Sequence, residues 1–307
     1  MKIVTWSELD EKEKLIPLMM LAFGEPFNPK ETEEMIRLDP RLNRSEVGLC
    51  GIEEGRVVGF VGLLELATKN VDGATERVGG IWGVATLPND ARKGVSTLLM
   101  NEVHRHFRDK HYRFSFLATR RTYVAHDMYL KLGYEDVTEF PSAYKSIQGK
   151  KNSGRRASST RPDWERILDI YRRYTSDKTG FVVRDASYLE MQQKRASIDF
   201  NSKVEVIVGK NGYVFYSDQR KSLEVAELVP DGEERSGELI GEIESQAEGL
   251  IYNRIVLDEK LLAAYKRKGY LTQSKSHSLL MAKPLTGDTT FRGNYSDRFY
   301  MTLLDFF

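Results

Sequence analysis

The apolar positions of residues 95–107 recur at the period of a helix. Apolar side chains stand three and four residues apart there, at Val95, Leu98, Leu99, Val103 and Phe107. This spacing predicts a helix with one apolar face. The preceding run, 79–88, is mostly apolar and contains three glycines, which predicts a strand that another backbone can approach closely. A basic turn with a glycine, residues 91–94, joins the predicted strand to the predicted helix.

The remaining patterns of the first half predict a mixed sheet with helices. Strands are predicted at 2–5, 47–53, 56–66 and 113–118, and helices at 7–23, 28–38 and 123–132, the last of which ends at Gly133. Strands and helices in this order predict an α+β fold.

The second half repeats the pattern of the first. Its predicted helices are 162–174, 186–195 and 234–247, and its predicted strands are 204–208, 213–216, 223–229 and 250–256. Residues 265–270 repeat the Tyr, Gly and Tyr spacing of residues 129–134. The sequence therefore predicts two similar domains in tandem.

The composition between the two halves predicts where they separate. Residues 145–161 are basic, rich in Ser and Gly and nearly free of apolar side chains, which is typical of an exposed linker. We expect a first domain at 1–146, a linker at 147–160, a second domain at 161–285 and a tail at 286–307. Because the tail ends in apolar residues, we expect it to dock toward the site rather than extend into water.

Composition limits the classes of partner. The chain has 307 residues with 46 basic and 45 acidic side chains, and this balance predicts neither a nucleic-acid nor a membrane partner. Its one cysteine, Cys50, excludes an internal disulfide framework and fits a reducing cytosol. The N-terminal residues lack the apolar core of a leader, and no apolar run approaches the ~18 residues of a membrane span. We expect a soluble, cytoplasmic protein, and a homo-oligomer remains open.

The basic turn is the first candidate for chemistry. Arg92, Lys93 and Gly94 directly precede the predicted helix at 95–107. Free backbone N–H groups and the positive end of the helix dipole favour an anion at such a position. The patterns GxxxxGK[ST] and GxGxxG are both absent, so the turn is not one of the common nucleotide loops.

Two motifs resemble the GNAT acyltransferase superfamily. Residues 91–96, ARKGVS, resemble its motif [QR]-x-x-G-x-[GA], with departures at Ala91 and Ser96. Residues 125–134, AHDMYLKLGY, resemble its A-x-x-x-Y-x-x-x-G-[FY] signature. The resemblance implies that acetyl-CoA binds along the central strand, the turn and the helix start, at Val84, Ala85, Thr86, Arg92, Lys93, Gly94, Val95, Ser96 and Thr97. It also implies that Tyr129 is the general acid that protonates the departing thiolate.

The tandem layout is similar to a narrower group, the enhanced-intracellular-survival-type acetyltransferases. Residues 83–88 with the basic turn resemble their cofactor strand and loop, and residues 180–184 resemble part of their degenerate second domain. The resemblance implies that the C-terminal carboxylate, here that of Phe307, is the general base. The alternative for this terminus is a tail that only seals the domain interface. Because this chain stops soon after the second domain, it resembles a shortened version without their sterol-carrier-like domain.

The second domain is predicted to lack a cofactor site. Where the first domain has Arg92 and Lys93, the second has Asp231, Glu233 and Glu234, which would repel a diphosphate. No metal site is predicted, because His104 and His106 are two residues apart and do not share a helix face.

Two functions remain open at this stage. The first is an N-acetyltransferase that acts directly on a primary amine, such as a polyamine, an aminoglycoside-like molecule or a lysine. The second is a non-catalytic acetyl-CoA-binding or scaffold protein, because Ala91 and Ser96 depart from the motif. Tyr129 and the basic turn favour the enzyme.

Overall fold

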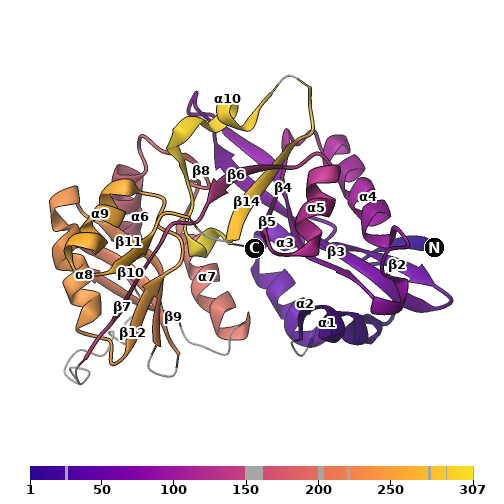
Figure 1. Ribbon diagram of the computed structural model, residues 1–307, viewed down its shortest axis with the longest axis horizontal. Coiled ribbons are helices and arrows are strands. Elements are labelled where there is room, and N and C mark those ends of the chain that lie inside the picture. The colour runs from indigo at the N-terminus through magenta and orange to yellow at the C-terminus, as the bar shows by residue number, and fades with distance from the viewer. Residues whose placement is uncertain are drawn as a thin grey trace.

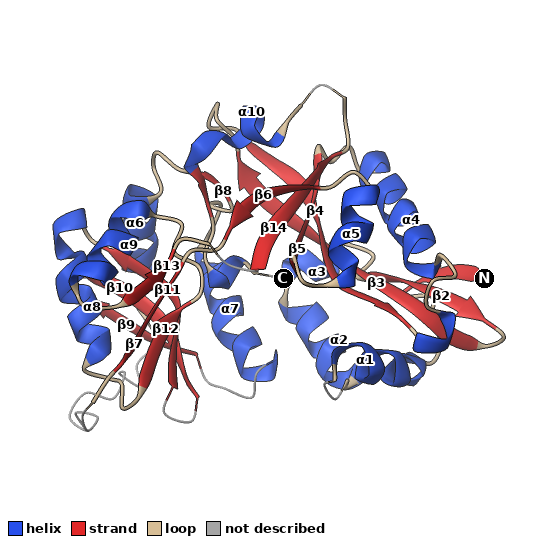
Figure 2. Ribbon diagram, viewed as in Figure 1, coloured by secondary structure: helices blue, strands red, loops and turns tan. Residues whose placement is uncertain are grey.

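The strands form two separate mixed sheets (Figure 1). The computed structural model describes residues 1–24, 27–148, 162–199, 204–219, 222–275, 278–287 and 289–306. The expected linker at 147–160 therefore lies almost wholly outside the described residues. Figure 2 shows helices on both faces of each sheet, so both sheets are mixed α/β layers.

The first sheet has the strand order β1-β2-β3-β4-β5-β14-β6. Its strands are Lys2–Thr5 (β1), Gly48–Glu53 (β2), Arg56–Lys69 (β3), Thr75–Thr86 (β4), Phe114–Arg120 (β5), Ser278–Pro284 (β14) and Glu135–Glu139 (β6). Two short strands, Thr179–Gly180 (β8) and Phe299–Tyr300 (β15), extend it beside β3. We call this sheet with its helices the first module. These helices are Ile16–Phe23 (α1), Pro29–Leu38 (α2), Pro40–Asn43 (α3), Val95–Asp109 (α4) and Val124–Lys131 (α5).

The second sheet has the order β13-β7-β12-β11-β10-β9. Its strands are Leu271–Gln273 (β13), Ser142–Ser146 (β7), Leu250–Asn253 (β12), Ser222–Pro230 (β11), Gly212–Gln219 (β10) and Val204–Gly209 (β9). We call this sheet with its helices the second module. These helices are Trp164–Tyr174 (α6), Ala186–Asp199 (α7), Ser236–Glu244 (α8) and Glu259–Arg267 (α9). The helix Phe291–Tyr295 (α10) lies at the top of Figure 1, and its Phe291 and Tyr295 side chains pack on the first sheet.

The two halves of the chain exchange strands, because β7 joins the second sheet while β14, with the short β8 and β15, joins the first. β14 comes from the second half of the chain but pairs between β5 and β6 of the first sheet. β7 comes from the first half but pairs between β12 and β13 of the second sheet. The boundaries expected from the sequence, 1–146 and 161–285, place these two strands in the opposite domains. The division at the linker therefore does not follow the sheets, because pairing partners far apart in the chain decide where each strand lies.

Both faces of the first sheet are buried. Alternate residues of its central strands, among them Leu63, Ile81, Leu117 and Met281, pack under α4 and α5. Their neighbours on the opposite face, among them Leu64, Phe116 and Leu280, pack against α10 and the C-terminal residues. Burial on both faces explains why β3 reads as an almost continuous apolar run.

One predicted helix begins later than expected. The sequence predicted a helix from residue 7, but a 3-10 turn spans Lys12–Leu15 and α1 starts at Ile16. The carboxylate of Glu8 instead accepts a hydrogen bond from the backbone N–H of Thr5 at 2.8 Å. The next helix, α2, starts as predicted, with the Asn28 side chain accepting from the backbone N–H of Lys30.

Candidate functional site

The central strands β4 and β5 separate at one end. Their parallel ladder runs from Gly79 opposite Ser115 to Ile81 opposite Leu117 and then stops. β4 continues to Thr86 while still bonded to β3. Residues 82–86 of β4 therefore have a backbone edge that no longer pairs with β5. A narrow ligand can add to such an edge through backbone hydrogen bonds.

Three of the predicted cofactor residues lie on this separated part of β4. Val84 and Thr86 are partly buried, and Ala85 is buried. Gly83 has a positive φ of 61°, and the register of β3 against β4 shifts nearby, between Phe60 and Gly62. This irregular backbone turns β4 away from β5.

The basic turn leaves an open surface at the start of α4. Gly94 has φ 83°, and a Cβ built there would meet no atom within 4 Å. The first helical hydrogen bond runs from the N–H of Leu98 to the carbonyl of Gly94 at 2.9 Å. The N–H groups of Val95, Ser96 and Thr97 precede that bond and have no helical acceptor. The turn therefore fits an anionic group such as a diphosphate.

The two cations of the turn are not equivalent. The ammonium of Lys93 lies 2.7 Å from the carboxylate of Asp90, which is 3 % exposed. Arg92 is exposed and has no carboxylate partner in the part of the chain that the structure describes. Arg92 is thus the freer cation for an incoming anion. The sequence reasoning missed this difference, although Asp90 stands only three residues before Lys93.

A side-chain contact ties the end of β4 to the start of α4. The hydroxyls of Thr86 and Ser96 lie 2.5 Å apart. Ser96 is the residue that departs from the superfamily motif, and here it bonds the strand to the helix that the turn connects.

Tyr129 lies on α5 and points into the main core of the first module. Its side chain is 6 % exposed and belongs to the cluster that includes Val95 and Leu99, with Val84 packed against it. Burial raises the pKa of Tyr129 to about 12. Among the described residues, no group hydrogen-bonds to its hydroxyl. Tyr129 is therefore protonated at neutral pH and keeps its donor free.

Tyr134 has a different role from Tyr129. Its buried hydroxyl contacts the Oγ of Ser115 at 2.6 Å and the Nε2 of His104 at 2.9 Å. The other ring nitrogen of His104 lies 3.3 Å from the ammonium of Lys283, which comes from the exchanged strand β14. These contacts connect α4, β5 and β14 inside the core, so Tyr134 is structural.

We expect His104 to destabilise the protein in acid. Burial and the neighbouring Lys283 lower the pKa of His104 to about 3. Since an unfolded histidine takes up a proton near pH 6.5, its contribution to stability is intact above that pH and is lost as the pH falls toward 3. This loss amounts to about 2 kcal/mol at pH 5. Chemical denaturation at pH 7 and pH 5 should therefore show a smaller loss for His104→Gln than for the unmodified chain. Equal losses in the two proteins would contradict the assignment.

The second module has a similar separation of strands with different chemistry around it. β11 and β12 pair from Ser222 to Glu224 and then part, while β11 continues to Pro230. Asp231 in the following turn pairs with Arg173 at 2.7 Å, and Glu233 pairs with Lys260. A cavity of about 650 Å³ beside this turn is lined by both carboxylates. At this turn the second module therefore presents paired charges, whereas the first module presents the exposed Arg92.

The C-terminal residues lie between the modules. The rings of Phe306 and Phe140 are 6.1 Å apart, and Phe140 belongs to the apolar cluster on the first sheet. The predicted base, the carboxylate of Phe307, lies outside the described residues. Within those residues, no helix has both the length and the apolar character needed to cross a membrane.

Comparison with solved structures shows that the two-module fold occurs elsewhere. A GCN5-related N-acetyltransferase from Kribbella flavida aligns with a TM-score of 0.65 at 20% identity, covering 92% of this chain and 72% of that one. A GCN5-related N-acetyltransferase from Anabaena variabilis aligns with a TM-score of 0.67 at 14% identity, covering 93% and 73%. Eis1 from Mycobacterium abscessus aligns with a TM-score of 0.61 at 18% identity, covering 93% and 74%. At these identities the likeness concerns the fold.

The family assignment rests on the first half of the chain. A search of curated proteins finds no match. Residues 6–137, which contain the separated strands, the basic turn and Tyr129, match the family model for an acetyltransferase (GNAT) domain. Residues 6–137 thus match a GNAT acetyltransferase domain, and the chain as a whole has a two-module fold similar to that of Eis1.

Proposed function

We propose that this chain transfers the acetyl group of acetyl-CoA directly to a primary amine. The observation that carries the proposal is the separation of β4 from β5 after Ile81 and Leu117, directly beside the open turn at Gly94. The free edge of β4 suits an extended pantetheine arm, and the start of α4 suits a diphosphate. A free tyrosine hydroxyl belongs to the same cluster of side chains.

Each group in the proposed site has one task. Arg92 and the N–H groups of Val95, Ser96 and Thr97 bind the diphosphate, with Lys93 and Gly94 shaping the turn. The backbone of Val84 and Ala85, with Thr86 behind them, orients the thioester and donates to its carbonyl oxygen. In the reaction the amine nitrogen bonds to the acetyl carbon and the carbon–sulfur bond breaks.

Two protons move in this reaction. Tyr129 donates its phenolic proton to the departing thiolate, and its raised pKa keeps that proton available at neutral pH. The attacking amine must lose a proton. We propose that the carboxylate of Phe307 accepts it, which requires the end of the chain to lie opposite the sulfur. A polyamine, an aminoglycoside-like molecule and a protein lysine are the acceptor classes to compare.

Calorimetry with acetyl-CoA, followed by release of free thiol in the presence of amines, tests the proposal. The amines would be spermidine, an aminoglycoside and a lysine-containing peptide. We expect binding with one site per chain and amine-dependent thiol release for at least one class. Binding without thiol release on any amine would favour a scaffold instead, and an absence of binding would contradict the site itself.

Deletion of Phe306 and Phe307 tests the proposed base. We expect kcat to fall by roughly two orders of magnitude because the proton acceptor is displaced. The affinity for acetyl-CoA should persist, since the turn and β4 are untouched. Unchanged turnover in the truncated chain would show that the tail only seals the interface.

A further inference from the structure

The last described residues lie along the seam between the two modules. Phe299, Met301 and Leu303 belong to or pack against the apolar cluster on the first sheet. Tyr300 and Leu304 belong to the cluster under α6 and α7 of the second module. The chain therefore inserts its side chains into both cores in turn, and its position depends on both modules.

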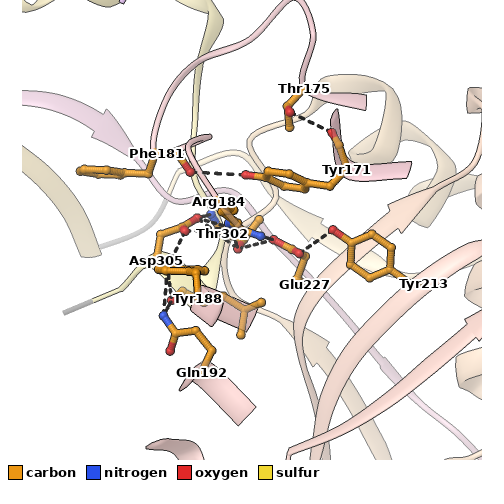
Figure 3. Close-up of polar contacts among 11 residues, drawn as sticks. Tyr171, Thr175, Phe181, Arg184, Tyr188, Gln192, Tyr213, Glu227, Thr302 and Asp305 are labelled. Atoms are coloured by element: carbon orange, nitrogen blue, oxygen red, sulfur yellow. Dashed lines mark hydrogen bonds and ion pairs between the residues drawn. The ribbon is translucent and has the colours of Figure 1, made fainter. Parts of the chain in front are cut away.

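A buried arginine in the loop between β8 and α7, packed against β11 and α6 of the second module, holds this segment. Arg184 pairs with Asp305 at 2.7 Å and with Glu227 of β11 at 2.5 Å (Figure 3). The side chains of Arg184, Glu227 and Asp305 are 1 %, 0 % and 4 % exposed. The guanidinium also lies over the ring of Tyr171, 4.3 Å from its centroid.

The carboxylate of Asp305 is bonded from several sides. It accepts the backbone N–H of Thr302 at 2.8 Å, and the hydroxyl of Tyr188 lies 3.0 Å away. That hydroxyl is also 3.1 Å from the carbonyl oxygen of Leu304, to which Gln192 donates as well. Figure 3 shows these groups converging on the tail from α7 and β11.

The arrangement specifies one position of the tail. The desolvation free energy of burying an ion pair is about as large as the electrostatic attraction between its charges, so such pairs add little net stability. A shift of the tail by one residue would leave Arg184 and Glu227 facing an apolar side chain in place of Asp305. Such a shift would also take the buried carboxylate of Asp305 away from Arg184, and a buried charge without its partner is strongly unfavourable, so the register of the segment is fixed.

The fixed segment lies against the separated strands. Met301 and Leu303 share a side-chain cluster with Trp82 and Ala118. Trp82 and Ala118 directly follow Ile81 and Leu117, the last paired residues of β4 and β5. The segment thus reaches the face of the first sheet opposite α4 and α5.

We propose that the second module is a receptor for residues 299–306 and that Arg184 is the positioning residue of the acetyl-transfer site. By holding Asp305, Arg184 fixes residues 299–306 against the separated ends of β4 and β5, on the face of the first sheet opposite α4 and α5. This inference rests on the proposed function of the first module. It assigns the second module a task that needs no ligand of its own.

Asp305→Asn tests the receptor, because it removes one charge at nearly constant shape and leaves Arg184 paired with Glu227. We expect amide hydrogen exchange within residues 299–306 to become about tenfold to a hundredfold faster. With the best amine acceptor, kcat should fall at least tenfold while the affinity for acetyl-CoA changes less than twofold. Glu224→Gln is the matched control, since Glu224 is a mostly buried β11 carboxylate that pairs with Arg254 and not with the tail. The control should leave tail exchange and kcat unchanged.

The outcomes separate this inference from the proposed function. Unchanged exchange in Asp305→Asn would overturn the receptor, and faster exchange with unchanged kcat would overturn the positioning role. If the unmodified chain transfers no acetyl group, the proposed function fails, whereas hydrogen exchange still tests the receptor. Should Asp305→Asn fail to fold, Tyr188→Phe removes only one hydroxyl from the same carboxylate, and a smaller change of the same sign is expected. No change in exchange in that variant would count against the receptor.

Discussion

Replacing Tyr129 with phenylalanine should lower kcat about a hundredfold and leave the affinity for acetyl-CoA unchanged. The substitution removes only a hydroxyl to which no described residue hydrogen-bonds, so the fold should persist. Because burial raises the pKa of Tyr129 to about 12, its ionisation should not reduce the rate of the unmodified chain below about pH 11. Steady-state kinetics with calorimetry of acetyl-CoA binding measure both effects.

The internal repeat supplies the control for this variant. Tyr265 occupies the position in α9 that Tyr129 occupies in α5, and it is fully buried. Its hydroxyl lies 3.4 Å from the side-chain nitrogen of Asn253. Tyr265→Phe should leave kcat unchanged, since the second module has no part in proton donation. Equal kcat in the Tyr129 variant and the unmodified chain would exclude Tyr129 as the acid.

Gly94→Val should weaken acetyl-CoA binding about tenfold to a hundredfold. The valine side chain would stand where the backbone of the turn is open to the diphosphate. It would also be strained, because Gly94 has φ 83° and a β-branched residue disfavours that conformation. Calorimetry measures the change in dissociation constant.

Gly73→Val is the control that distinguishes backbone strain from steric exclusion of the diphosphate. Gly73 has φ 79° in the turn between β3 and β4, and a Cβ there also meets no atom within 4 Å. Both variants should lose a similar amount of thermal stability, but only Gly94→Val should lose affinity. If both variants bind acetyl-CoA like the unmodified chain, the diphosphate does not approach the turn at Gly94.

The elements that the sequence predicted best are those determined by neighbouring residues. The strand, turn and helix at 79–107 occur as β4 and α4, because glycines, a basic turn and an apolar period act within a few residues. α5 ends as predicted before Gly133, which has φ 86°. The predicted start of the first helix, at residue 7, was wrong. The Glu8 carboxylate accepts a hydrogen bond from the backbone N–H of Thr5, and the helix begins only at Ile16.

What the sequence could not predict depends on distant partners. β7 and β14 were not among the predicted strands, and nothing in their own residues says which sheet they join. Likewise, residues 180–184 attracted attention in the sequence only through their family resemblance. The carboxylates that Arg184 binds, those of Glu227 and Asp305, lie 43 and 121 residues away in the chain. The pairing of Lys93 with Asp90 is local and could have been found from their spacing.

The exchanged strands affect how the protein is made. β6 ends at Glu139, but β14, which pairs with both β5 and β6, ends only at Pro284. During synthesis β5 and β6 therefore lack their common partner until the chain has reached β14. At a synthesis rate of about 5–20 residues per second, the gap stays open for roughly 7–30 seconds on the ribosome. During that time two strand edges are available for wrong pairing. The nascent chain is thus most exposed to aggregation after residues 1–139 have already emerged.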